Sequence, residues 1–133
     1  MRSRMQATGV DWCFDVHGDE VMPYNFIISS QGVPSFTPLL RELTDGYRAA
    51  LMRASPDFQV AHGYADLSPG QANMTMCSNW VAESFGCLAM TLEMPFKDTA
   101  DTPRPDEGWS PARSRRLGAA NLDALAAVID RLR

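Results

Sequence analysis

The sequence is poor in the residues and motifs that most often carry catalysis. Among its 133 residues are only two histidines and three cysteines. It contains neither G-x-x-x-x-G-K nor G-x-G-x-x-G, which argues against chemistry on a bound nucleotide. No serine stands in a nucleophile elbow, and Cys77 has no neighbouring base, so nucleophilic catalysis is unsupported.

The three cysteines are odd in number and form no C-x-x-C pair. Cys13 and Cys87 lie within apolar runs typical of strands, so we expect buried, reduced thiols. Reduced thiols indicate a reducing compartment, and we therefore expect a cytoplasmic protein. No apolar run approaches membrane-spanning length, and no basic N-terminal segment precedes a long apolar stretch, so a membrane is not expected as a partner.

An excess of positive charge is also missing. The formal net charge is −4 and the isoelectric point is about 5.0. This balance argues against nucleic acid or an anionic membrane as a partner. The one local cluster of basic residues comprises Arg113, Arg115 and Arg116, and we expect it to form a solvated helix face.

Two apolar runs predict the strands. Residues 10–16 are mostly apolar or aromatic, which predicts a strand covered on both faces, and residues 87–92 predict a second strand. Strands that alternate with helices predict an α/β fold with a mostly parallel or mixed sheet sandwiched between helices, in one domain over residues 1–133. The expected helices cover residues 37–54 (starting at Thr37 and Pro38), residues 78–85 (capped by Ser78), and a segment from Ser110 and Pro111, in which Leu125, Val128, Ile129 and Leu132 form a stripe.

Each predicted strand ends in a group capable of chemistry. His17 follows the first apolar run, and Gly18 allows the backbone to turn sharply after it. Glu93 follows the second run directly. Because α/β sheets place their sites at the carboxyl ends of strands, we expect both side chains at one edge of the sheet, in an active site.

The segments around these two residues resemble a known family. D-V-H-G-D-E-x-x-P-Y-N-F begins at Asp15, and T-L-E-M-P-F-K-D begins at Thr91. Both are similar to motifs of the zinc metallocarboxypeptidases (carboxypeptidase A superfamily), in the bacterial branch related to cytosolic carboxypeptidases. The likeness extends from about Met5 to Asp98, and the separation of 76 positions between His17 and Glu93 suits the family's later histidine and its catalytic glutamate.

The resemblance implies a zinc-dependent enzyme that removes a C-terminal or side-chain-linked amino acid from a peptide or protein. His17 would be one zinc ligand and Glu93 the general base. The family's H-x-x-E ligand pair and its carboxylate-binding arginine normally come earlier, and no such upstream H-x-x-E is present. The resemblance therefore implies that residues 1–133 are the C-terminal portion of a catalytic domain. We expect the N-terminal half of that catalytic domain to be the partner of this chain. We also expect little activity from this chain alone.

Other residues have secondary expected roles. Asp15 lies two residues before His17 on the same strand face and could fix the orientation of the imidazole. Asn25 and Tyr64 are weaker candidates for contact with substrate, Asn25 because it follows the His17 loop and Tyr64 because it lies in the loop of residues 62–71.

Two alternatives remain open from the sequence. His17, Glu20 and the only other histidine, His62, could form a complete zinc site, because three protein ligands and a water are what catalytic zinc requires. Such a chain would be a self-contained amidohydrolase. The second alternative is a non-catalytic binding domain that keeps the family's fold.

Overall fold

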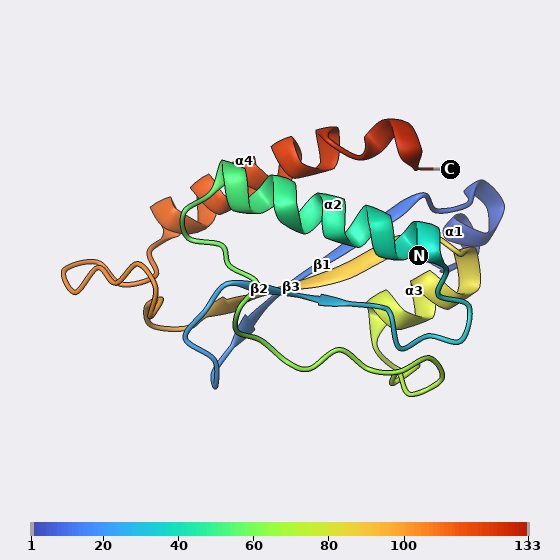
Figure 1. Ribbon diagram of the computed structural model, residues 1–133, viewed down its shortest axis with the longest axis horizontal. Coiled ribbons are helices and arrows are strands. Elements are labelled where there is room, and N and C mark those ends of the chain that lie inside the picture. The colour runs from blue at the N-terminus through green and yellow to red at the C-terminus, as the bar shows by residue number, and fades with distance from the viewer. Residues whose placement is uncertain (1, 133) are drawn as a thin grey trace.

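A computed structural model describes residues 2–132 and shows a mixed three-stranded sheet with helices on both faces (Figure 1). The strands are β1 (Trp12–Asp19), β2 (Phe26–Ser29) and β3 (Leu88–Pro95), in the order β1-β3-β2. The central strand β3 is parallel to β1 and antiparallel to β2. The predicted α/β class with a mixed, sandwiched sheet is therefore confirmed.

Two of the helices, α2 and α4, begin where a capping residue precedes a proline in the first turn. The elements are α1 (Arg2–Thr8), α2 (Pro38–Ala54), α3 (Cys77–Phe85), α4 (Pro111–Ala126) and the short 3₁₀ helix η1 (Ile129–Arg131). Thr37 accepts a hydrogen bond from the Leu40 N–H, and Ser110 accepts one from the Arg113 N–H, so both predicted starts are confirmed. Within residues 2–132, no helix is long and apolar enough to cross a membrane.

One helix prediction is wrong, and one helix was not predicted. Ser78 does not cap α3, because its hydroxyl lies 2.9 Å from the Thr91 hydroxyl and fastens the helix to β3 instead. The segment before residue 9 forms α1, which was not predicted from its polar, basic composition.

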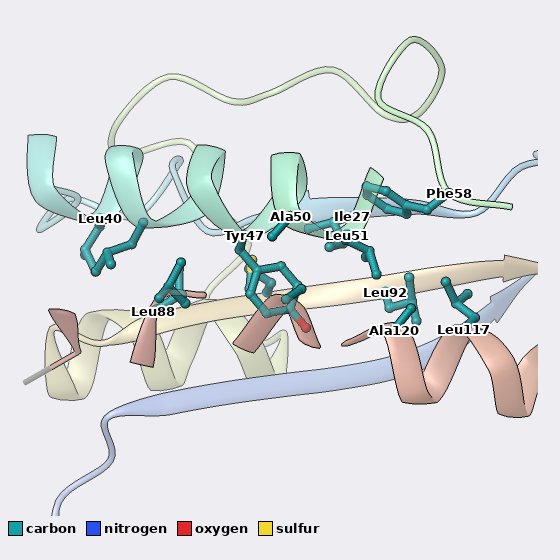
Figure 2. Packing of buried hydrophobic residues seen from close by; sticks show 14 residues of the cluster. Ile27, Leu40, Tyr47, Ala50, Leu51, Phe58, Leu88, Leu92, Leu117 and Ala120 are labelled. Carbon is teal, nitrogen blue, oxygen red and sulfur yellow. The ribbon is translucent and has the colours of Figure 1, made fainter. Parts of the chain in front are cut away.

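The main core lies between one face of the sheet and the helices α2 and α4 (Figure 2). Tyr47 is fully buried at its centre, as its helical spacing predicted, and its hydroxyl donates to Asn121 Oδ1 at 2.9 Å. The predicted final stripe is only partly confirmed. Val128 is buried, but α4 ends at Ala126, and Ile129 on η1 is 51% exposed.

The opposite face of the sheet is covered by α3 and holds two of the cysteines. Cys87 is buried and Cys13 is partly buried, while Cys77 at the start of α3 is exposed. All three are free, as expected. Burial, reinforced by the nearby Cys77 and Cys87, raises the pKa of the Cys13 thiol to about 12, so this thiol stays protonated and unreactive.

The expectation that β1 is covered on both faces is confirmed only for its first half, which packs against the main core on one face and against the cluster under α3 on the other. β1 is an edge strand, and Val16, His17 and Gly18 are exposed, whereas β3 is buried along almost its whole length. An apolar run has the same appearance in a sequence whether or not a neighbouring segment covers it. The outer edge and part of the outer surface of β1 are thus open in this structure.

The prediction that Arg113 lies on a solvated helix face is wrong, because its side chain is 1% exposed. Its guanidinium donates to Asp57 Oδ1 at 2.7 Å and to Asp98 Oδ1 at 2.7 Å, and it reaches Thr102 as well. The two carboxylates balance its charge and use its donors, which makes burial tolerable. Arg115 and Arg116 are exposed, as expected.

The Arg113 contacts hold Asp57 and Asp98 ionised. Burial acts to raise the pKa of Asp57, but hydrogen bonds from Arg113 and Thr102 outweigh it and hold the pKa below its usual value. Asp98 has a lowered pKa for the same kind of reason, with backbone N–H groups of Arg104 and Thr99 adding to Arg113. The network fastens the segment after β3 to α4.

We predict that Arg113→Met lowers the free energy of unfolding by about 3 kcal/mol, because it leaves two carboxylates facing each other without their cation. Urea denaturation measures the loss. Arg115→Met, on the same helix but exposed, should change it by less than about 0.5 kcal/mol. Equal losses in the two variants would contradict the role of Arg113.

Acid should weaken the same network. A carboxyl whose folded pKa is depressed stabilises the fold above its unfolded pKa, and the contribution disappears as the pH falls through the folded value. The difference between wild type and Arg113→Met should therefore shrink below about pH 4.

Candidate active site

His17 and Glu93 face each other across the parallel pair β1 and β3. Their Cα atoms are register partners, so both side chains project from the same face of the sheet. His17 Nδ1 lies 3.9 Å from Glu93 Oε1. The two residues that the sequence placed at one sheet edge are thus adjacent in space.

Glu93 is the more enclosed of the two residues. It is 8% exposed overall, whereas the His17 side chain is 50% exposed. Burial raises the pKa of Glu93, and the nearby carboxylates of Asp19, Asp15 and Glu20 raise it further, while His17 acts in the opposite sense. A carboxylate with a raised pKa accepts a proton more readily, which is what a general base requires.

Asp15 has the position expected of a residue that orients the imidazole. Its Oδ1 lies 3.2 Å from His17 Nε2, two residues away on the same face of β1. A carboxylate beside one ring nitrogen fixes the ring and leaves the other nitrogen for a ligand. That other nitrogen, Nδ1, faces Glu93.

Gly18 does not serve the sharp turn that was predicted for it. β1 continues through it to Asp19, and its φ is not in the left-handed region, so it makes no sharp turn. A Cβ at this position would lie 2.5 Å from Cε1 of Phe96. The glycine lets the exposed Phe96 ring lie against the backbone next to His17, and a larger residue would displace that ring.

The turn after β1 is built around Asp19, whose structural role was missed from the sequence. Asp19 Oδ1 accepts hydrogen bonds from the N–H groups of Val21 (2.6 Å) and Met22 (2.9 Å), and the Tyr64 hydroxyl donates to Oδ2. Burial acts to raise the pKa of Asp19, but these hydrogen bonds outweigh it and lower the pKa. An aspartate at the end of a strand and before a turn was the available signal.

Tyr64 therefore fastens the loop of residues 62–71 to the site. Its hydrogen bond to Asp19, together with some burial and the nearby carboxylates, raises the pKa of Tyr64 to about 12. The residue is still 50% exposed. Its hydroxyl lies beside the Asp19 turn, two residues beyond His17.

The other predicted site residues lie elsewhere or take other contacts. Glu20 is exposed in the turn. The His62 ring stacks on Tyr24, with ring centroids 4.3 Å apart. Asn25 is fully buried, and its amide donates to the Asp57 carbonyl at 2.9 Å, which gives it a structural bond instead of an exposed face.

The donor groups fit one part of a metal site. Over residues 2–132, no group of three or more His, Cys, Asp or Glu side chains is placed to hold a metal ion. The structure thus does not bring His17, Glu20 and His62 together. A half-exposed imidazole oriented by a carboxylate nevertheless fits the chemistry of a single zinc ligand.

Fold and site together give a mixed sheet that presents one half-exposed histidine beside one buried carboxylate. No protein-family model matches the chain. An uncharacterised protein of Zymomonas mobilis is 44% identical over 132 residues, which are 99% of this chain and 35% of that protein.

Solved structures give the class of these relatives. The metallo-carboxypeptidase of Pseudomonas aeruginosa, in complex with (2-guanidinoethylmercapto)succinic acid, matches with a TM-score of 0.95 and 45% identity, over 99% of this chain and 35% of that chain. The metallo-carboxypeptidase of Burkholderia cenocepacia matches with a TM-score of 0.91 and 42% identity, over 98% and 34%. A Shewanella denitrificans protein named as a carboxypeptidase A matches with a TM-score of 0.96 and 49% identity, over 98% and 35%.

The chain spans about a third of the length of each of these relatives. In sequence and fold it is similar to a C-terminal portion of these metallo-carboxypeptidases, which confirms the resemblance seen in the two motifs.

We predict that Tyr64→Phe frees the loop of residues 62–71 from the site. The change removes the hydrogen bond to Asp19 and should cost about 1 kcal/mol, with faster amide exchange confined to this loop and the Asp19 turn. Tyr24→Phe is the matched control, because the Tyr24 ring stacks on His62 and no bond from it to Asp19 is present. Unchanged exchange in Tyr64→Phe would contradict the role of this contact.

Proposed function

We propose that this chain supplies the histidine ligand and the general base of a zinc-dependent carboxypeptidase. The observation that carries the proposal is the pairing of His17 with Glu93 across β1 and β3 in a chain that matches metallo-carboxypeptidases at 42–49% identity. His17 would hold zinc, and Asp15 would keep its ring in place. At least one further ligand would come from outside residues 2–132, because catalytic zinc takes three ligands from protein and these residues place no group of three together.

Glu93 would be the general base of the reaction. Zinc, when bound, would supply Lewis-acid activation of the scissile carbonyl and of water. Glu93 takes a proton from the attacking water and returns it to the leaving amine, and its raised pKa suits both transfers. Its burial keeps bulk solvent away from the carboxylate while it does so.

The proposed substrate is the C-terminus of a peptide or protein, or an amino acid linked through a side chain. The Pseudomonas relative binds a compound with two carboxylates and a guanidino group, which supports recognition of a carboxylate-bearing end. Tyr64, exposed beside the site, is the residue of this chain that we propose for contact with substrate. The three free cysteines favour a reducing, cytoplasmic location.

Zinc titration of the isolated chain separates the proposed half-site from the self-contained alternative. We predict weak zinc binding that His17→Ala abolishes and His62→Ala leaves unchanged, because His62 stacks on Tyr24. Isothermal titration with zinc, with both variants in parallel, gives the affinity and the stoichiometry. Tight one-to-one binding lost in both variants would establish the His17/Glu20/His62 site and reject the proposal.

Hydrolysis tests the proposed activity directly. We predict that this chain, joined to the upstream two-thirds of the Pseudomonas metallo-carboxypeptidase, releases C-terminal residues from peptides. Glu93→Gln should lower kcat about 1,000-fold with zinc retained, because the general base is lost. Glu20→Gln, an exposed carboxylate of the same site, is the control and should keep kcat within about threefold. Activity that survives Glu93→Gln would exclude Glu93 as the base, and a folded, zinc-loaded but inactive protein would favour a binding domain.

A further inference from the structure

The three cysteines of the chain gather on the face of the sheet that α3 covers. Cys13 on β1 and Cys87 just before β3 belong to the apolar cluster under this helix. Cys77 is the first residue of α3 itself. Cys13 and Cys77 are 64 positions apart in the sequence, so it is the packing of α3 on the sheet that brings them to one place.

The contacts of α3 hold Cys77 above the strand pair. Ser78, the next residue, has its hydroxyl 2.9 Å from that of Thr91 on β3. Thr91 is the register partner of Asp15, and Cys13 lies two residues before Asp15 on the same face of β1. The Cys13 thiol is hydrogen-bonded to Cys77. Close approach of two cysteine side chains is what a disulfide requires.

The two thiols differ in exposure, which gives them different roles. Cys77 is exposed and lines a cavity of about 260 Å³ together with Arg2, Met5 and Trp80. An oxidant dissolved in water therefore reaches the Cys77 sulfur. Cys13 is half-buried and does not meet such an oxidant by itself.

Cys13 can nevertheless react with its neighbour. Attack within one molecule needs no encounter, so a thiol already in contact with its target has a very high effective concentration. Burial raises the pKa of Cys13 most, and negative charge at Cys77 raises it further. The second effect disappears once Cys77 is oxidised, which makes the Cys13 proton easier to remove at the moment of attack.

We propose that Cys77 is an oxidation site for hydrogen peroxide and that Cys13 converts the oxidised sulfur into a Cys13–Cys77 disulfide. The Cys77 thiolate attacks peroxide, an S–O bond forms, the O–O bond breaks, and the departing hydroxide takes up a proton to become water. The Cys13 sulfur then attacks the sulfenic acid, an S–S bond forms, the S–O bond breaks, and hydroxide leaves as water with the Cys13 proton. Two thiols thus lose two electrons, and one peroxide becomes two waters.

The disulfide would fasten α3 to β1 beside the candidate active site. Cys13 lies two residues before Asp15, whose carboxylate is 3.2 Å from His17 Nε2. In a reducing compartment such a bond is transient: peroxide forms it, and dithiols reverse it. The inference goes beyond the proposed function and does not depend on it, because neither zinc nor hydrolysis takes part.

Peptide mapping of the oxidised chain tests the pairing. The folded chain is treated with hydrogen peroxide at mildly alkaline pH, where thiols react as thiolates, and the remaining thiols are alkylated. It is then digested, without reductant, by trypsin and a glutamate-specific protease. Glu83 lies between Cys77 and Cys87, so this digest separates the two. We expect a linked peptide that joins Cys13 to Cys77 and that dithiothreitol removes.

Three variants assign the roles. Cys77→Ser should slow the loss of thiols to peroxide at least about tenfold, because the two thiols that remain are partly or fully buried. Cys87→Ala is the matched control and should keep the rate of disulfide formation within about twofold. Cys13→Ala should stop the reaction at the Cys77 sulfenic acid, which dimedone traps. Equal melting temperatures of the reduced proteins would show that the variants keep the fold.

The melting temperature of the oxidised wild type gives a second measurement. A disulfide compatible with the native fold should raise it by about 5–15 °C, because it closes a long loop in the unfolded chain, and dithiothreitol should reverse the rise. Any of the following would overturn the proposal: no disulfide, a Cys13–Cys87 peptide, a dimer linked through Cys77, a Cys77 sulfenic acid that persists beside unreacted Cys13, or an oxidised chain that melts no higher than the reduced one.

Discussion

The parallel pairing of β1 with β3 is the constraint on which the candidate site depends. Its register sets Cys13 opposite Ala89, Asp15 opposite Thr91 and His17 opposite Glu93. Because side chains alternate between faces, a slip of one residue would send His17 to the face of the sheet that α2 and α4 cover and leave Glu93 without its partner. The buried apolar side chains of β3 and the core under α2 and α4 fix this register.

The chain after each of these two strands is held by a carboxylate. Asp19 closes the turn after β1 and accepts a hydrogen bond from Tyr64, and Asp98 beyond β3 accepts one from Arg113. Arg113 also binds Asp57, which joins the end of α2 to the start of α4. Charge-assisted hydrogen bonds thus hold the segments that follow β1 and β3, next to the position at which His17 and Glu93 meet.

The sequence was informative where local chemistry decides the structure. Apolar runs that stop at His17 and Glu93 predicted two strands and one shared edge, and capping residues predicted the starts of α2 and α4. It was not informative where distant partners decide. Arg113 is buried because Asp57, 56 residues away, and Asp98 meet it in space, and no local pattern signals this. The apolar character of β1 was readable, but its open edge was not.

The roles of His17 and Glu93 form the central claim, and anomalous diffraction tests it most directly. Data would be collected at the zinc absorption edge from crystals of this chain joined to the upstream two-thirds of the Pseudomonas relative. The account predicts a zinc peak about 2.0–2.1 Å from a ring nitrogen of His17, with the Glu93 carboxylate nearby but not bonded to it. A peak held by Glu20 and His62, or a zinc ion with no bond to His17, would contradict it.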